Sequence, residues 1–164
     1  MQALAESHRS EAGPLDLVEQ VLISEDYPYE RDASQAHFAV EGAWSDHRLW
    51  FAWRDDIRIL ELNLAVDLKS PPARRADLCD LVSRINERLA LGHFEAAEEE
   101  RTLIYRSVLP VLDAPLTVLQ VSTLIAAALD AADRFYPAFN FLIWAGKSAQ
   151  EAVDAAMFET AGEA

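Results

Sequence analysis

The sequence has a single cysteine, Cys79, and few residues that interrupt secondary structure, with 5 glycines and 7 prolines in 164 residues. One cysteine cannot form an intramolecular disulfide, so nothing in the sequence indicates an oxidising compartment. We expect Cys79 to pack as a small hydrophobic residue on a helix, beside Leu78, Leu81 and Val82. Because 51% of the residues are hydrophobic and breakers are scarce, the composition is typical of a globular chain.

Basic residues are also scarce, with 14 against 28 acidic residues and a net charge of −14. This charge repels phosphate backbones and anionic lipid surfaces, so we expect no nucleic-acid partner and no membrane partner. The longest uncharged run, Ala114–Leu129, is too short and too polar to span a bilayer. The N-terminal sequence has no secretory signal pattern. We therefore expect a cytoplasmic protein with one domain over residues 14–162 and a flexible tail over residues 1–13.

Motifs for catalysis or cofactor binding are missing. The chain has four histidines, His8, His37, His47 and His93, and none of their spacings is typical of a metal site. Neighbouring carboxylates at Asp55–Asp56 and Glu98–Glu100 fall where we expect solvated hairpin turns. Residues 146–148 read GKS, but Phe141 occupies the position where a phosphate-binding loop requires glycine. We expect no catalytic residue, no metal and no cofactor.

Hydrophobic periodicity predicts helices and strands in a clear order. Pro14 opens a helix that ends near Asp26. Alternating residues then predict a three-strand meander. Ile57 and Ile59 have the opposite parity to the leucines that follow, so we expect a bulge near Ile59–Leu60. The predicted strands are His37–Trp44, His47–Arg54 and Ile57–Leu68.

The second half of the chain predicts a helix, a hairpin and further helices. A helix from Ser70 to Gly92 precedes two strands, His93–Glu98 and Thr102–Leu109, whose turn lies at Glu98–Arg101. From Asp113 the chain is helical and apolar nearly all round, which indicates burial on more than one side, against the sheet and against a second helix or subunit. We expect Pro137 to kink or break this helix before short helices at Phe139–Trp144 and Ala149–Phe158.

The fold class that follows is α+β. It has an antiparallel sheet, made of a three-strand meander and a two-strand hairpin, packed by helices in the order α-βββ-α-ββ-α, with a C-terminal helical extension.

Aromatic residues provide the candidate interface. Trp50 lies on the strand face opposite Leu49 and Phe51, so it faces outward or into a second layer. The other candidates are Phe139, Phe141 and Trp144, which fall within the aromatic segment Arg134–Lys147. For Trp50, packing against the chain's own helices is favoured over an interface. For the C-terminal rings, packing onto the domain or onto a second subunit is favoured over recognition of a partner. The second helix is the most basic element, through Arg74, Arg75, Arg84 and Arg88, but acidic neighbours favour an ordinary charged helix face over a partner face.

The strand sequence LWFAWRDDIRILELNL and the C-terminal pattern P-A-F-x-F-x-x-W-x-G-K-S carry a family resemblance. With the order of elements, they make the chain over about residues 14–162 resemble the bacterial YbjN family, described as regulators of sensory transduction. The resemblance implies a fold similar to that of type III secretion chaperones, which are small, acidic, dimeric proteins that bind extended segments of their clients. It implies a role in sensory transduction or stress regulation and supplies no catalytic residue.

Two functions remain open from the sequence. The first is a non-enzymatic regulatory or chaperone-like protein, a homodimer that binds a protein or peptide through an exposed sheet face or an interface groove. The second is a small-molecule sensor with an aromatic pocket between helix and sheet.

Overall fold

The structure is a computed structural model that describes residues 13–97 and 102–161. The N-terminal tail, apart from Gly13, and the turn predicted at Glu98–Arg101 lie outside these residues. The elements, in chain order, are α1 Pro14–Ser24, β1 Tyr29–Arg31, β2 Gln35–Val40, β3 His47–Arg54, β4 Ile59–Lys69, the 3-10 turn η1 Pro72–Arg74, α2 Arg75–Asn86, β5 His93–Ala96, β6 Thr102–Pro110, α3 Val118–Trp144 and α4 Ala149–Ala161.

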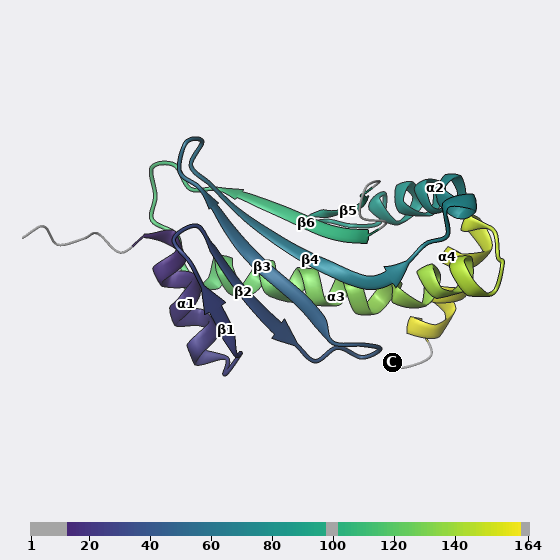
Figure 1. The fold of residues 1–164 in the computed structure, drawn as a ribbon, viewed down its shortest axis with the longest axis horizontal. Coiled ribbons are helices and arrows are strands. Elements are labelled where there is room, and N and C mark those ends of the chain that lie inside the picture. The colour runs from purple at the N-terminus through teal and green to yellow at the C-terminus, as the bar shows by residue number, and fades with distance from the viewer. Residues whose placement is uncertain (1–12, 98–101, 162–164) are drawn as a thin grey trace, which may run out of the picture.

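The six strands form one antiparallel sheet in the order β1-β2-β3-β4-β6-β5 (Figure 1). The predicted α+β class is confirmed, with the element order α-ββββ-α-ββ-α-α. The additional strand is β1, a three-residue edge strand that pairs with β2 through Tyr29 and Phe38. Its sequence, Tyr-Glu-Arg, is too short and too polar to show alternation, which explains why periodicity did not predict it.

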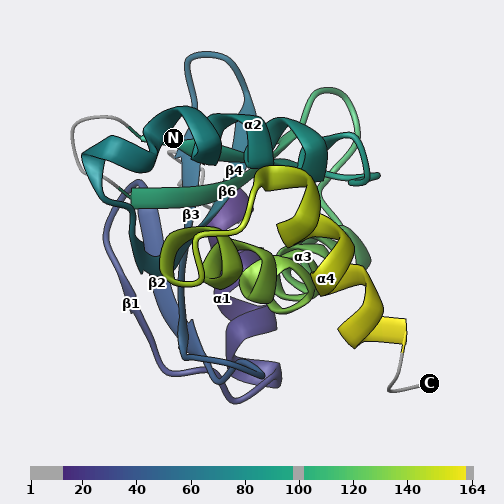
Figure 2. The same cartoon turned by 90° about the vertical axis from the view of Figure 1, so that its right-hand side faces the viewer.

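The helices α1 and α3 cover one face of the sheet (Figure 2). The long helix α3 runs behind the strands, with α1 at one end of the molecule and α2 and α4 at the other (Figure 1). Phe38 and Phe51 stack 6.0 Å apart on the covered face, and at the other end Phe94 meets Phe139 at 5.3 Å. The core therefore lies between α3 and the inner face of the sheet, and extends between α3, α2 and α4.

The start of β4 has no bulge, contrary to our prediction. Ile59 pairs in regular register with Arg54 and Pro110, and the register shift lies between Val66 and Lys69. Ile57 belongs to the β3–β4 turn, where Arg58 has a φ of 56°. This turn, rather than a bulge, accounts for the change of parity.

Pro137 does not break α3, which continues to Trp144. A proline inside a helix cannot donate to the carbonyl four residues earlier, here that of Asp133. The indole Nε1 of Trp44 donates to that carbonyl at 3.0 Å. A tertiary hydrogen bond therefore replaces the missing helical one, and no sequence periodicity reports it.

Cys79 is exposed, so the prediction that it packs in the core is wrong. The buried stripe of α2 consists of Leu78, Leu81, Val82 and Ile85. Cys79 follows Leu78 by about 100° around the helix, which places it outside this stripe.

Candidate functional site

The face of the sheet opposite α3 carries no helix within the described part of the chain (Figures 1 and 2). Successive residues of a strand point to opposite faces, so every second residue of each strand reaches this uncovered face. The residues paired across its middle row are Glu30, His37, Trp50, Asn63, Arg106 and His93. One row of aromatic, amide and charged side chains thus crosses the whole sheet.

Trp50 occupies the middle of this row, as its position opposite Leu49 and Phe51 predicts. The indole is half-buried, and the His37 ring stacks on it with centroids 6.1 Å apart and planes 19° apart. On its other side Trp50 pairs with Asn63 of β4. Neighbours on both sides therefore hold the indole in place while part of it stays exposed.

Asn63 is almost fully buried, at 1% exposed, although it lies on the uncovered face. Its Nδ2 donates to Glu61 Oε1 at 2.9 Å, and its Oδ1 accepts from Arg106 Nε at 3.2 Å. Buried amides are stable only when both groups have partners. Asn63 therefore fixes Glu61 and Arg106 relative to each other.

Arg106 extends this network toward the β5 edge. Its guanidinium lies 3.5 Å from Glu61 and 3.4 Å from Glu95, and Glu95 in turn accepts from His93 Nε2 at 2.7 Å. Each of these charged side chains is held before any partner arrives, which lowers the entropy that binding must overcome.

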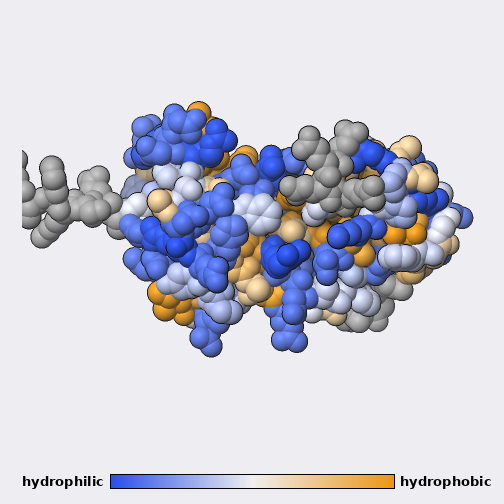
Figure 3. Space-filling model, viewed as in Figure 1, coloured by the Kyte–Doolittle hydropathy of each residue, from blue (hydrophilic) through white to orange (hydrophobic). Residues whose placement is uncertain are grey.

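The charge of the uncovered face differs from that of the whole chain. Its outward positions hold four basic and four acidic side chains: Arg48, Arg54, Lys69 and Arg106 against Glu30, Glu61, Asp67 and Glu95. Figure 3 shows this face, where apolar side chains are exposed between hydrophilic ones in the middle. A balanced surface in a chain of net charge −14 can meet another protein without strong repulsion.

The structure does not bring the other predicted interface residues to this face. Phe139 is fully buried against Phe94, so it has no surface to offer a partner and is a core residue. Phe141 is half-buried beneath Lys147, whose Nζ lies 5.2 Å from the ring centroid. Trp144 is 74% exposed at the end of α3.

The arginines of the second helix are engaged within the chain. Arg74 donates to the carbonyls of Leu142 and Lys147, both at 2.9 Å, and thereby caps the end of α3. Arg75 donates to the Ala96 carbonyl and Arg88 donates to the Arg84 carbonyl. Arg84 donates to the side chains of Asp80 and Gln150. These contacts agree with an ordinary charged helix face rather than a partner face.

Asp133 is a structural centre that sequence reasoning missed. Its Oδ1 accepts from the Ala43 amide at 3.0 Å and lies 2.8 Å from His47 Nε2, a nitrogen on a side chain only 1% exposed. A carboxylate only accepts, so His47 Nε2 carries the proton. Since the Asp133 carbonyl also accepts from Trp44, this residue fastens the β2–β3 connection to α3. The sequence feature that could have pointed to Asp133 is Pro137. It lies four residues later and has no N–H to donate to the Asp133 carbonyl.

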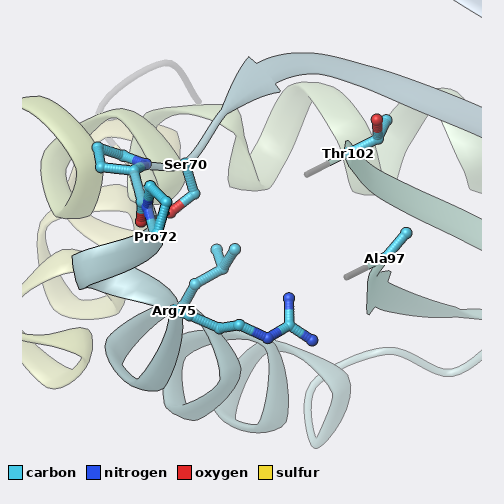
Figure 4. A pocket seen from close by; sticks show the side chains of 7 residues that line it. Ser70, Pro72, Arg75, Ala97 and Thr102 are labelled. Atoms are coloured by element: carbon cyan, nitrogen blue, oxygen red, sulfur yellow. Dashed lines mark hydrogen bonds between the residues drawn. The ribbon is translucent and has the colours of Figure 1, made fainter. Parts of the chain in front are cut away.

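A small hollow lies between α2 and the β5–β6 hairpin (Figure 4). Its volume is about 200 Å³, and Figure 4 shows Arg75 reaching across it from the side of Ser70 and Pro72 toward Ala97. Arg75 donates to the Ala96 carbonyl at 3.2 Å. None of the residues that line it is aromatic, unlike the pocket that the sensor hypothesis predicts.

Two kinds of site are missing from the described residues. They contain no group of three or more histidine, cysteine, aspartate or glutamate residues that could hold a metal ion. None of their helices is long and apolar enough to cross a membrane.

Comparison with known families shows to which family the chain belongs. Residues 14–141 match the model of the family YbjN, whose description is "Putative bacterial sensory transduction regulator". The chain belongs to the YbjN family. No curated protein matches the chain. A solved structure described as "Crystal structure of YbjN, a putative transcription regulator from E. coli" is similar, with a TM-score of 0.56 and 12% identity over 74% of this chain and 87% of that chain.

The extent of the YbjN match bears on the candidate sites. Residues 14–141 include Trp50, Asn63, Arg106 and Asp133, whereas Trp144 and α4 follow the matched region. The match is therefore shorter than the resemblance over residues 14–162, and it omits the end of the C-terminal pattern. The description of the YbjN family is that of a regulator and names no enzymatic activity. At 12% identity, the E. coli structure shows the shared fold alone.

Proposed function

We propose that this chain is a non-enzymatic, chaperone-like regulatory protein of the cytoplasm that binds an extended segment of another protein on the uncovered face of its sheet. The observation that carries the proposal is Trp50, an aromatic side chain held half-exposed in the centre of that face. Tryptophan and arginine are enriched among the residues that dominate protein–protein binding energy. Arg106 lies in the same row as Trp50, two strands away.

The surroundings of Trp50 support recognition of an extended segment. The row from His37 to His93 offers apolar surface at Trp50 and fixed donors and acceptors at Arg106 and Glu95. An extended segment laid on the sheet presents side chains and backbone groups at regular spacing, so it can satisfy both. A regulator that works by binding needs no catalytic group, in keeping with the family's description.

Affinity capture from native lysate with mass spectrometry tests the proposal. We expect wild-type protein and Trp144→Ala to capture the same partners and Trp50→Ala to lose them. The control substitutes a tryptophan that is more exposed than Trp50 and lies on α3 rather than on the sheet. Equal capture by Trp50→Ala, with an unchanged melting temperature for the variant, contradicts the proposal.

A small-molecule sensor remains the second candidate, favoured by the hollow beside Arg75. The cavity of about 200 Å³ is smaller than the usual ligand pocket of about 300–1,000 Å³, so it would take only a small ligand, and the guanidinium would orient an acceptor group on it. A thermal-shift screen of small metabolites with wild type and Arg75→Ala distinguishes the two functions. A ligand of this hollow raises the melting temperatures of wild type and of Trp50→Ala but not that of Arg75→Ala.

A further inference from the structure

Arg48 differs from the other arginines of residues 13–97 and 102–161, because it alone has no hydrogen bond, ion pair or aromatic ring contact. Every other arginine in these ranges has such a partner. Acidic residues outnumber basic ones by 28 to 14, so the free guanidinium does not result from a shortage of carboxylates in the chain. Its position in the sheet accounts for it.

Arg48 is exposed on the uncovered face, two residues before Trp50 on β3. Its neighbours across the sheet are Ala39 of β2 and Ala65 of β4. An alanine side chain is too short to cover a guanidinium and has no group to accept from it. Asp67, the next outward residue of β4, is exposed and forms no ion pair with Arg48 in the described part of the chain. A free cation therefore stands beside the half-exposed indole.

The other basic side chains of this face offer less to an incoming carboxylate. Arg106 is already held by two glutamates, and Arg54 lies 3.4 Å from Asp56. A new carboxylate at either place meets a negative charge as well as a positive one. Lys69 lies at the end of β4, beyond the register shift and away from Trp50. Arg48 is thus the position next to Trp50 where a carboxylate gains a partner without displacing another.

The spacing of Arg48 and Trp50 indicates how a segment could reach both. Residues two apart in a strand lie on one face and are separated by roughly 6.7 Å along it. An extended segment aligned with β3 presents its own side chains to the sheet at the same spacing. The net charge of −14 does not prevent an acidic contact there, because charges beyond about 8 Å are largely screened at physiological salt.

We propose that Arg48 selects the client: the bound segment carries an acidic side chain two residues from a large apolar one, with the carboxylate on Arg48 and the apolar group on Trp50. This inference rests on the proposed function and adds the chemistry of the segment. Arginine can hold a carboxylate through two parallel hydrogen bonds, so Arg48 fixes the register of the segment, while Trp50 supplies apolar contact area.

Selection of random linear peptides, displayed on phage, against the immobilised full chain tests the inference. We expect the selected peptides to share an apolar residue and an acidic residue two positions apart. Fluorescence anisotropy with one such peptide should show a dissociation constant at least about tenfold higher for Arg48→Glu, because reversing the charge replaces attraction by repulsion. Arg54→Glu is the matched control. It makes the same change on the same strand and face, and should alter binding less than about twofold.

A charge exchange completes the test. A peptide in which lysine replaces the acidic residue should bind Arg48→Glu more tightly than it binds wild type, and circular dichroism checks that each variant is folded. Peptides that require Trp50 but show no acidic preference and bind Arg48→Glu normally overturn the inference and leave the proposed function standing. Equal losses in Arg48→Glu and Arg54→Glu also overturn it, since they indicate an effect of overall charge. If no selected peptide requires Trp50, the proposed function fails and this inference fails with it.

Discussion

Asp133 shows how much one side chain contributes to this fold. Its carboxylate holds the Ala43 amide and the buried His47 ring, and its backbone carbonyl holds Trp44. Gly42 lies close against the same His47 ring. A Cβ atom at position 42 would lie 2.3 Å from His47 Nε2 and would clash with it. The connection between β2 and β3 is therefore fixed to α3 by geometry and by hydrogen bonds together.

Removing the Asp133 carboxylate is expected to destabilise the protein. In Asp133→Ala the buried His47 Nε2 loses its partner, which costs roughly 1–3 kcal/mol in the free energy of unfolding. Urea denaturation measures the change. Asp130→Ala, one turn earlier at an exposed position of the same helix, is the control and shares the effect of replacing aspartate by alanine within a helix. Equal stability of the two variants would contradict this role.

At the scale of elements, the helix α3 depends on a contact outside itself. Trp44 donates to the carbonyl that Pro137 leaves free, so the helix and the β2–β3 connection stabilise each other. The continuity of α3 therefore depends on its contact with the β2–β3 connection. Its own sequence predicted a kink or a break at Pro137.

A double-mutant cycle tests this contact. Trp44→Phe is expected to cost about 1 kcal/mol, the usual net value of a hydrogen bond, in the Pro137 background. In Pro137→Ala the new amide at position 137 can donate to the Asp133 carbonyl, so the same Trp44→Phe change should cost less. Thermal denaturation of the four proteins gives the coupling energy. A coupling of zero would show that Trp44 does not replace the missing helical bond.

The edge strand β1 is tied to α1 by ionic contacts that depend on pH. Arg31 donates to Asp16 and Glu19, and Tyr29 donates to Glu19. The hydrogen bond from Arg31 lowers the pKa of Asp16, and those from Tyr29 and then Arg31 lower the pKa of Glu19. A carboxyl group whose pKa is lowered on folding contributes stability above its ordinary pKa and loses it as the pH falls through the lowered value.

The stability gap between wild type and Arg31→Ala should therefore depend on pH. We expect wild type to be more stable near neutral pH and the gap to shrink as the pH falls below about 4, where the two carboxyl groups become protonated in the unfolded chain. Melting temperatures measured from pH 7 to pH 2.5 or so give the gap. A gap that stays constant over this range would show that these ion pairs do not contribute as described.

Sequence reasoning succeeded where one face of an element is buried and failed where a tertiary contact decides. Alternation predicted β3 and placed Trp50 on the strand face opposite Leu49 and Phe51, because the strand period relates directly to burial. It did not predict β1, which is short, nor the continuity of α3 through Pro137, which depends on Trp44 from a distant part of the chain. It also left open whether Phe139 belongs to the core or to an interface, since aromatic clusters of both kinds have the same composition, and the structure buries this ring.

At the scale of the whole molecule, the uncovered sheet face differs in charge from the rest of the chain. The uncovered sheet face is balanced in charge and centred on Trp50, whereas the whole chain has a net charge of −14. With a charge of −14 on each copy, self-association has to overcome mutual repulsion.

The homodimer that we expect from the sequence should therefore strengthen with salt. Raising the salt concentration from about 0.02 M to 0.5 M screens the repulsion between the copies, and we expect the dimer dissociation constant to fall several-fold. Sedimentation equilibrium at several salt concentrations measures it. Weakening with salt would contradict this expectation and would indicate an interface held by opposite charges.

Site-specific photocrosslinking tests the central claim, that the uncovered face receives a client protein, most directly. A photoreactive amino acid replaces Ala39, which is exposed on that face in the strand beside Trp50, or Ala76, which is exposed on α2. In cells, we predict client adducts from position 39, their loss when Trp50→Ala is added, and no such adducts from position 76. Client adducts from position 76 alone, or adducts from position 39 that persist without Trp50, would contradict the account.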